Sequence, residues 1–139
     1  MRRMDGSIRR GAIVEEANSK DPTLHRTLLA LAGLTGALGV AAAAMGSHGA
    51  DANLSTAADF LLFHAPALIG LSLYRGNRLA GIAGLVLVIG VALFAGDLAM
   101  RSRLGTPLFP FAAPLGGGTM ILGWLLVAAS ALLGEKARA

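Results

Sequence analysis

Four long stretches without a charged residue constrain this chain more than any other feature. They cover residues 27–47, 60–74, 79–96 and 104–134 of a sequence of 139 residues. The hydrocarbon core of a bilayer is about 30 Å thick, and roughly 20 apolar residues of α-helix cross it. Runs of this length and number leave almost no room for a soluble domain. We therefore predict a small polytopic membrane protein.

The predicted fold is all-α: an integral membrane four-helix bundle with antiparallel helices and short loops. Residues 1–26 are polar and charged without apolar periodicity, so they are predicted to form a flexible basic cytoplasmic tail. Residues 27–134 form the predicted transmembrane domain, and residues 135–139 a short second cytoplasmic tail. The four spans are predicted at residues 27–46, 55–74, 79–100 and 113–133.

The composition agrees with this class. Hydrophobic residues make up 55% of the chain and charged residues 14%, and the mean hydropathy is +0.65, outside the usual soluble range. The chain has no cysteine, which excludes disulfides, thiolate metal sites and cysteine nucleophiles. Its basic residues lie at span ends and in the tail rather than in a stripe with aromatics, so no nucleic-acid partner is expected.

The distribution of lysine and arginine predicts the orientation. Cytoplasmic loops of membrane proteins carry an excess of these residues. Placing both termini in the cytoplasm leaves only Arg101 and Arg103 outside. It places inside the basic tail and Arg26, Arg75, Arg78, Lys136 and Arg138. This bias and the compact loops also predict a bacterial inner membrane.

The first apolar run has a competing interpretation. A basic segment followed by LLALAGLTGALGVAAAA is typical of a secretory signal peptide, cut after Ala42 or Ala44. Three further spans follow, however, and the run is longer than a usual signal core. We therefore expect it to stay in the membrane as a span. Met4 is an alternative start to Met1.

Four segments resemble a known family. AAAMGSHGAD (residues 42–51) is similar to the GAFGAHG signature of the family called domain of unknown function 423, which includes the transmembrane protein 256-like proteins. FHAPALIGL (63–71) resembles that family's YHALALL segment. LFAGDLA (93–99) and LFPFAAPLGGGTMILGW (108–124) resemble its LFSGSLY and TPIGGxxxIxGW stretches. The segments occur in family order over residues 27–133.

The resemblance implies a four-helix membrane protein, and no activity comes with it. Two positions depart from the family pattern. Asp97 stands where a small polar residue such as serine is expected, and Pro66 interrupts the second span.

Ionisable groups inside a bilayer are costly, about 2.5–3.5 kcal/mol for a central Asp or Arg on insertion scales, so each is a candidate functional position. His64 lies near the middle of the second span, where an imidazole either takes part in chemistry or hydrogen-bonds across a helix interface. His48 lies between glycines at the outer end of the first span, and both a loop-packing role and a site role stay open.

Asp97 and Arg101 are four residues apart, with the acid first. This spacing places them on one helix face and predicts an ion pair near the outer surface. A polar outer pocket formed by His48, Asp59, Asp97 and Arg101 is the alternative.

No metal, cofactor-binding or catalytic residues are predicted. His48 and His64 should lie at different depths, and Asp59 and His64, five residues apart, point to different helix faces. The chain has no HxxxH or ExxH spacing, no phosphate loop and no nucleophile elbow.

Small residues recur inside the spans. Gly33, Gly36 and Gly39 form a GxxGxxG pattern, but within an apolar span they are packing positions rather than a dinucleotide loop. Small residues let helix backbones approach closely, in the bundle or in a homo-oligomer. The predicted helix-packing positions are Gly33, Gly36, Gly39, Gly84, Gly96 and Gly117.

These observations favour a non-enzymatic accessory or scaffold component that packs in the lipid bilayer against itself or a larger membrane complex. The alternative is a small oligomeric transporter or channel that uses His64 as a mid-membrane gate or proton site. A third hypothesis is a membrane enzyme that acts on a lipid or quinone at the outer pocket.

Overall fold

The structure is a computed structural model that describes residues 22–49, 51–74 and 76–136. Over these residues it forms four α-helices, each long and apolar enough to cross a membrane. The predicted all-α four-helix bundle is therefore confirmed. Most of the two predicted tails, residues 1–21 and 137–139, lies outside the described residues. The helices are α2 (Pro22–Gly49), α3 (Ala52–Leu73), α4 (Arg78–Leu104) and α5 (Ala112–Lys136).

Local sequence signals set the helix ends. α2 begins at Pro22, five residues before the predicted span, because proline fits the first helical position, where no N–H is needed. Asp51 and Asn77 cap α3 and α4 by accepting the backbone N–H groups three residues later, at 3.1 and 3.0 Å. α4 ends where Gly105 takes a left-handed φ of 69° and donates its N–H to the Arg101 carbonyl.

Pro66 does not end α3. The helix continues to Leu73, and the proline lies on its exposed side. Proline removes one backbone donor from a helix, so the effect here is one missing hydrogen bond rather than a break between two spans.

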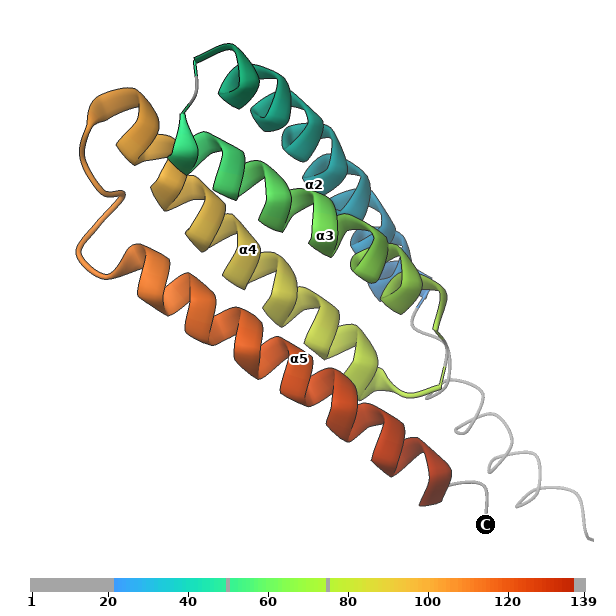
Figure 1. The fold of residues 1–139 in the computed structure, drawn as a ribbon. Coiled ribbons are helices and arrows are strands. Elements are labelled where there is room, and N and C mark those ends of the chain that lie inside the picture. Colours follow the sequence, from blue (N-terminus) through green and yellow to red (C-terminus); the bar gives the residue numbers. More distant parts are fainter. Residues whose placement is uncertain (1–21, 50, 75, 137–139) are drawn as a thin grey trace, which may run out of the picture.

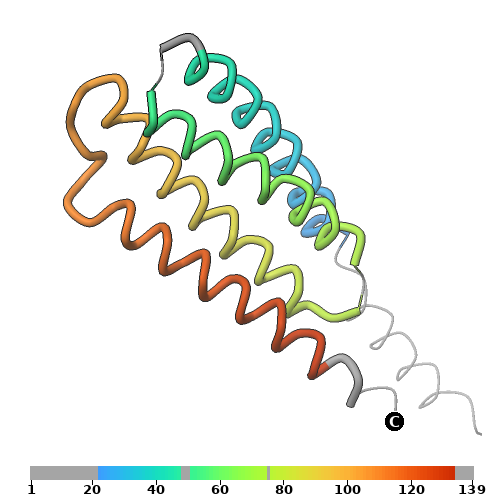
Figure 2. Tube along the Cα trace, in the orientation of Figure 1, coloured from blue at the N-terminus to red at the C-terminus, as the bar shows by residue number. Residues whose placement is uncertain are grey.

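The helices pack in chain order. α2 packs against α3, α3 against α4 and α4 against α5, and α2 also touches α4. Consecutive helices run antiparallel (Figures 1 and 2). The α2–α3 and α4–α5 connections therefore lie at one end, here called the double-loop end. The start of α2, the α3–α4 connection and the end of α5 lie at the other, here called the terminal end.

Glycines allow close contacts between α2 and its neighbouring helices. A Cβ atom built on Gly39 would lie 2.9 Å from the Leu62 side chain of α3, and one on Gly84 of α4 would lie 3.0 Å from Leu28 of α2. Gly36 has ordinary van der Waals room beside Ala65. These three predicted packing glycines thus face a neighbouring helix.

The other three predicted packing positions do not make such contacts inside the described part of the chain. A Cβ on Gly33 or Gly117 would have no neighbour within 4 Å, and one on Gly96 would reach only the Leu108 side chain, at 4.0 Å.

At the α4–α5 crossing the glycines face backbone atoms of the other helix, and the sequence did not reveal this. A Cβ on Gly116 would lie 2.6 Å from the Phe94 backbone nitrogen and 2.9 Å from the Gly90 carbonyl oxygen. A Cβ on Gly90 would lie 2.7 Å from the backbone nitrogen of Met120. Only residues without a side chain permit this approach, because backbone atoms cannot move aside as a flexible side chain can.

The core is a thin apolar layer between these helices. Leu28, Leu68, Leu87 and Val91 are its largest fully buried apolar side chains. Many large apolar side chains of α2 and α5 are exposed, including Leu34, Leu38, Leu122 and Leu125, as expected for helices that face lipid.

Candidate functional site

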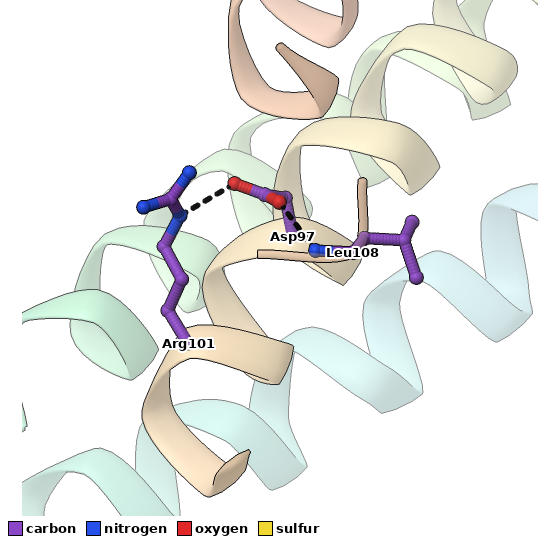
Figure 3. A network of polar contacts seen from close by, with 3 residues as sticks. All are labelled: Asp97, Arg101 and Leu108. Carbon is purple, nitrogen blue, oxygen red and sulfur yellow. Dashed lines mark hydrogen bonds and ion pairs between the residues drawn. The ribbon is translucent and has the colours of Figure 1, made fainter. Parts of the chain in front are cut away.

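A buried carboxylate forms the main polar site at the double-loop end (Figure 3). The side chain of Asp97, near the end of α4, is 0% exposed. Its Oδ2 accepts a hydrogen bond from Nε of Arg101 at 2.7 Å, and its Oδ1 accepts one from the backbone N–H of Leu108, also at 2.7 Å. The ion pair predicted from the spacing is therefore confirmed, and Leu108 is an additional partner.

This arrangement fixes the α4–α5 loop. A buried charge is tolerated when it is paired and its oxygens accept hydrogen bonds, and Asp97 meets both conditions. One oxygen is held by its own helix and the other by the loop, so the carboxylate connects the end of α4 to the segment that leads into α5. Asp97 acts as a structural clamp.

A second polar contact joins α3 to α4 at the same end. The Ser102 hydroxyl donates to Oδ2 of Asp51, the residue that caps α3. The Ser102 hydroxyl first, then the Leu54 N–H, lowers the pKa of the Asp51 carboxyl below its ordinary value of 3.8. Nearby, Nη2 of Arg103 contacts the Met45 sulfur of α2 at 2.7 Å. The end of α4 is thus tied to both helices of the first hairpin.

The second candidate site surrounds His64 in the middle of α3. Its side chain is only 7% exposed. Nδ1 lies 2.7 Å from the Phe60 carbonyl oxygen, which only accepts, so Nδ1 donates. Nε2 lies 3.3 Å from Nε1 of Trp124 on α5, which only donates, so Nε2 accepts. A neutral imidazole with its proton on Nδ1 satisfies both contacts.

Aromatic rings enclose this histidine. The Phe60 ring stacks on the imidazole with centroids 6.1 Å apart, and the Trp124 ring lies at 6.0 Å. Phe60 also packs against Phe94 of α4, with centroids 4.5 Å apart. His64 thus accepts a hydrogen bond that joins α5 to α3, and a chemical role for it stays a prediction.

The outer pocket anticipated from the sequence is assembled only in part. Asp97 and Arg101 are together, whereas Asp59 lies on the exposed side of α3. The side chain of His48 is outside the described part of the structure, so its role stays a prediction. In the described ranges, no hydrogen bond links His64 to the Asp97 clamp.

Among residues 22–49, 51–74 and 76–136, no three His, Asp or Glu side chains gather as a group able to hold a metal ion.

Two polar contacts at the terminal end were missed by sequence reasoning. Nδ1 of His25 donates to the Ser72 carbonyl at 3.0 Å, and Nδ2 of Asn77 donates to the Ser130 carbonyl at 2.7 Å. The first joins α2 to α3 and the second joins α4 to α5. Their only sequence signal is a polar residue at a span end, which does not identify a partner about 50 residues away.

Comparisons with known proteins identify related chains. A family model described as a protein of unknown function (DUF423) matches residues 42–117. A UPF0382 membrane protein of Schizosaccharomyces pombe is 32% identical over 117 residues, which cover 70% of this chain and 95% of the relative. The UPF0382 inner membrane protein YgdD of Escherichia coli K12 is 26% identical over 118 residues, 77% of this chain and 90% of the relative.

A third relative, the UPF0382 membrane protein YwdK of Bacillus subtilis, is 24% identical over 120 residues, 77% of this chain and 97% of the relative. No solved structure is significantly similar to the chain.

Proposed function

Because this chain belongs to the DUF423 family of small multi-pass membrane proteins, we propose that it acts through helix packing rather than catalysis. In this proposal it is an accessory or scaffold component that binds a second copy of itself or a larger membrane complex. No activity is known for the relatives from which to transfer one.

The engagement of the buried polar groups carries this proposal. Throughout the three described ranges, every buried side-chain nitrogen and oxygen has a hydrogen-bond partner. His64 and Asp97 use their ring nitrogens and carboxylate oxygens to join helices. Buried hydroxyls donate to carbonyls of their own helix, as in Thr35, Ser72 and Ser130. The buried polar side chains of the described residues are thus used in hydrogen bonds within the bundle.

The outer helices supply the surface for a partner. α2 and α5 each pack mainly against one neighbour. Their remaining faces carry exposed leucines, and a Cβ atom on Gly33 or Gly118 would meet no atom of the described chain within 4 Å. In a bilayer such faces meet either lipid or another helix, and small residues favour another helix.

The proposed orientation has both termini in the cytoplasm of a bacterial cell. Arg26 and Arg78 lie at the terminal end. Arg101 and Arg103 lie at the double-loop end, and Asp97 neutralises the first of them. The positive-inside rule then favours the terminal end as cytoplasmic. The inner membrane location rests on the name of the Escherichia coli relative.

Affinity isolation of tagged protein in native nanodiscs, followed by mass spectrometry, tests the accessory role. We expect a stoichiometric partner or a homo-oligomer. Gly33→Leu in α2 and Gly118→Leu in α5 form a matched pair, because a Cβ at either position meets no atom of the chain within 4 Å. Loss of the partner in only one variant identifies the helix that binds it. A strictly monomeric, partner-free protein would overturn the proposal.

Transport is the second candidate function, and the burial of an ionisable imidazole in mid-helix favours it. The Trp124 contact at 3.3 Å is the longer of the two His64 hydrogen bonds. We therefore expect it to break more easily, which would leave Nε2 free to accept a proton or to bind a solute. Proteoliposome flux that disappears in His64→Ala supports transport. Equal flux in wild type and variant excludes His64 as the gate.

A further inference from the structure

The Asp97 clamp places a cationic group and an apolar loop side by side. Arg101 and Leu108 donate to the two oxygens of the same carboxylate. The guanidinium and the middle of the α4–α5 loop are therefore both hydrogen-bonded to Asp97 and lie close together (Figure 3). Neither depends on the other for its position, since the buried Asp97 fixes both. The Arg101 guanidinium and the α4–α5 loop therefore form a surface whose geometry is fixed by hydrogen bonds to Asp97.

The length of α4 fits a position of this surface at headgroup depth. Arg78 and Arg101 stand near opposite ends of α4, roughly 34 Å apart along the axis at 1.5 Å per residue. That separation slightly exceeds the hydrocarbon thickness of about 30 Å. When Arg78 lies at one polar boundary, Arg101 lies at the other.

The guanidinium of Arg101 keeps donors available. It has five N–H groups, and only the Nε–H is directed to Asp97. The side chain is 42% exposed, and no hydrogen bond from Nη1 or Nη2 is made to the described residues. A guanidinium fixed in this way presents a planar pair of donors suited to a phosphate.

The neighbouring loop is apolar and faces outward. Leu104, Leu108 and Phe109 are exposed, and Phe111 is 74% exposed. Phe111 also has a left-handed φ of 69°, a conformation that is strained for a bulky residue. Its exposed ring gains little packing from the described chain in return. An aromatic ring held outward at this depth is positioned to contact lipid.

We propose that the double-loop end binds a phospholipid, with Arg101 holding the headgroup phosphate and the loop around Phe109 and Phe111 contacting the acyl chains. Two other polar side chains near the end of α4 have partners of their own. Ser102 donates to Asp51, and Arg103 contacts Met45. Arg101 is thus the cation placed to take the phosphate. Lipid binding at this site requires no protein partner, so it can be refuted without refuting the accessory role.

Native mass spectrometry of delipidated protein in mild detergent tests the site. The probes are dioleoyl phosphatidylglycerol and dioleoylglycerol, which share acyl chains and differ in the phosphate headgroup. We expect wild type to retain the phospholipid at least about tenfold better, as a charge-assisted hydrogen bond predicts. Arg101→Gln should remove this preference, and Arg103→Gln is the matched control that should keep it.

A second variant guards against misfolding. Arg101→Gln leaves Asp97 without its cation, so the double variant Asp97→Asn with Arg101→Gln keeps a neutral hydrogen-bonded pair and should also lose the preference. Phe111→Asn accepts the left-handed conformation and should weaken retention of both lipids without lowering thermal stability.

Three results would overturn the proposal. The first is equal retention of the two lipids by wild type, and the second is an unchanged preference in both Arg101 variants. The third is displacement of the phospholipid by inorganic phosphate at the same phosphate concentration, which would indicate a site for a free anion. Unchanged retention in Phe111→Asn would remove the loop from the site.

Discussion

The close approach of α4 and α5 makes a specific prediction for Gly116→Ala. The new methyl carbon would lie 2.6 Å from the Phe94 nitrogen, 2.9 Å from the Phe94 Cα and 2.9 Å from the Gly90 carbonyl oxygen. Non-bonded carbon atoms are most stable at about 3.5–4.0 Å, so the helices must separate by roughly 1 Å. All three neighbours are backbone atoms, and no side-chain rotation relieves the contact.

The expected magnitude follows from two opposing effects. Overpacking typically costs about 1–3 kcal/mol, and replacing glycine by alanine within a helix regains up to about 1 kcal/mol. We expect Gly116→Ala to lower the free energy of unfolding by roughly 1–2 kcal/mol. Gly117→Ala is the matched control, since its Cβ meets nothing within 4 Å. It should be neutral or stabilising by up to about 1 kcal/mol.

The chain contains its own reporter for this experiment. Trp124 is the single tryptophan, and it lies on α5 against His64 of α3. Its fluorescence during titration of a mild detergent with dodecyl sulfate should follow the separation of α5 from the bundle. Equal midpoints for Gly116→Ala and Gly117→Ala would refute the proposed crossing geometry.

Three further predictions use the polar contacts. Asp97→Ala removes the acceptor of a loop N–H, so amide hydrogen exchange over residues 105–111 should rise while α2 peptides stay unchanged. His64→Phe keeps the ring but leaves the Trp124 N–H unpaired; the unfolding free energy should fall by about 1–2 kcal/mol, and adding Trp124→Phe should recover part of the loss. Asp51 has a pKa lowered in the folded state, so its contribution is present above pH 3.8 and is lost as pH falls through the folded pKa. As the pH falls through this range, the melting temperature of Asp51→Asn should decrease less than that of the wild type.

Much of the fold could be predicted from the sequence because it depends on local properties, namely hydrophobic length and residue spacing. The charge-free runs predict the four helices through hydrophobic length alone. The Asp97–Arg101 pair was predictable because positions four apart lie on the same helix face. The helices extend beyond the apolar runs, as at Pro22 and Leu104, because capping residues rather than hydrophobicity set their ends.

The contacts between helices could not be predicted from the sequence, for a physical reason. α5 is apolar around its whole circumference, so its sequence carries no periodic signal of which face turns inward. Gly116 and Gly117 look equivalent in the sequence, yet only Gly116 meets another helix. The Leu108 contact with Asp97 depends on a loop conformation, and the Trp124 contact with His64 joins residues that are 60 positions apart.

The packing of the helices in chain order has a consequence for biogenesis. Each helix after α2 packs against the helix synthesised just before it, so the bundle can assemble stepwise as the chain leaves the insertion machinery. Asp51, at the start of α3, receives the Ser102 hydroxyl only after α4 has been inserted. A nascent chain arrested before α4 would therefore hold a first hairpin whose Asp51 carboxylate lacks the Ser102 hydroxyl.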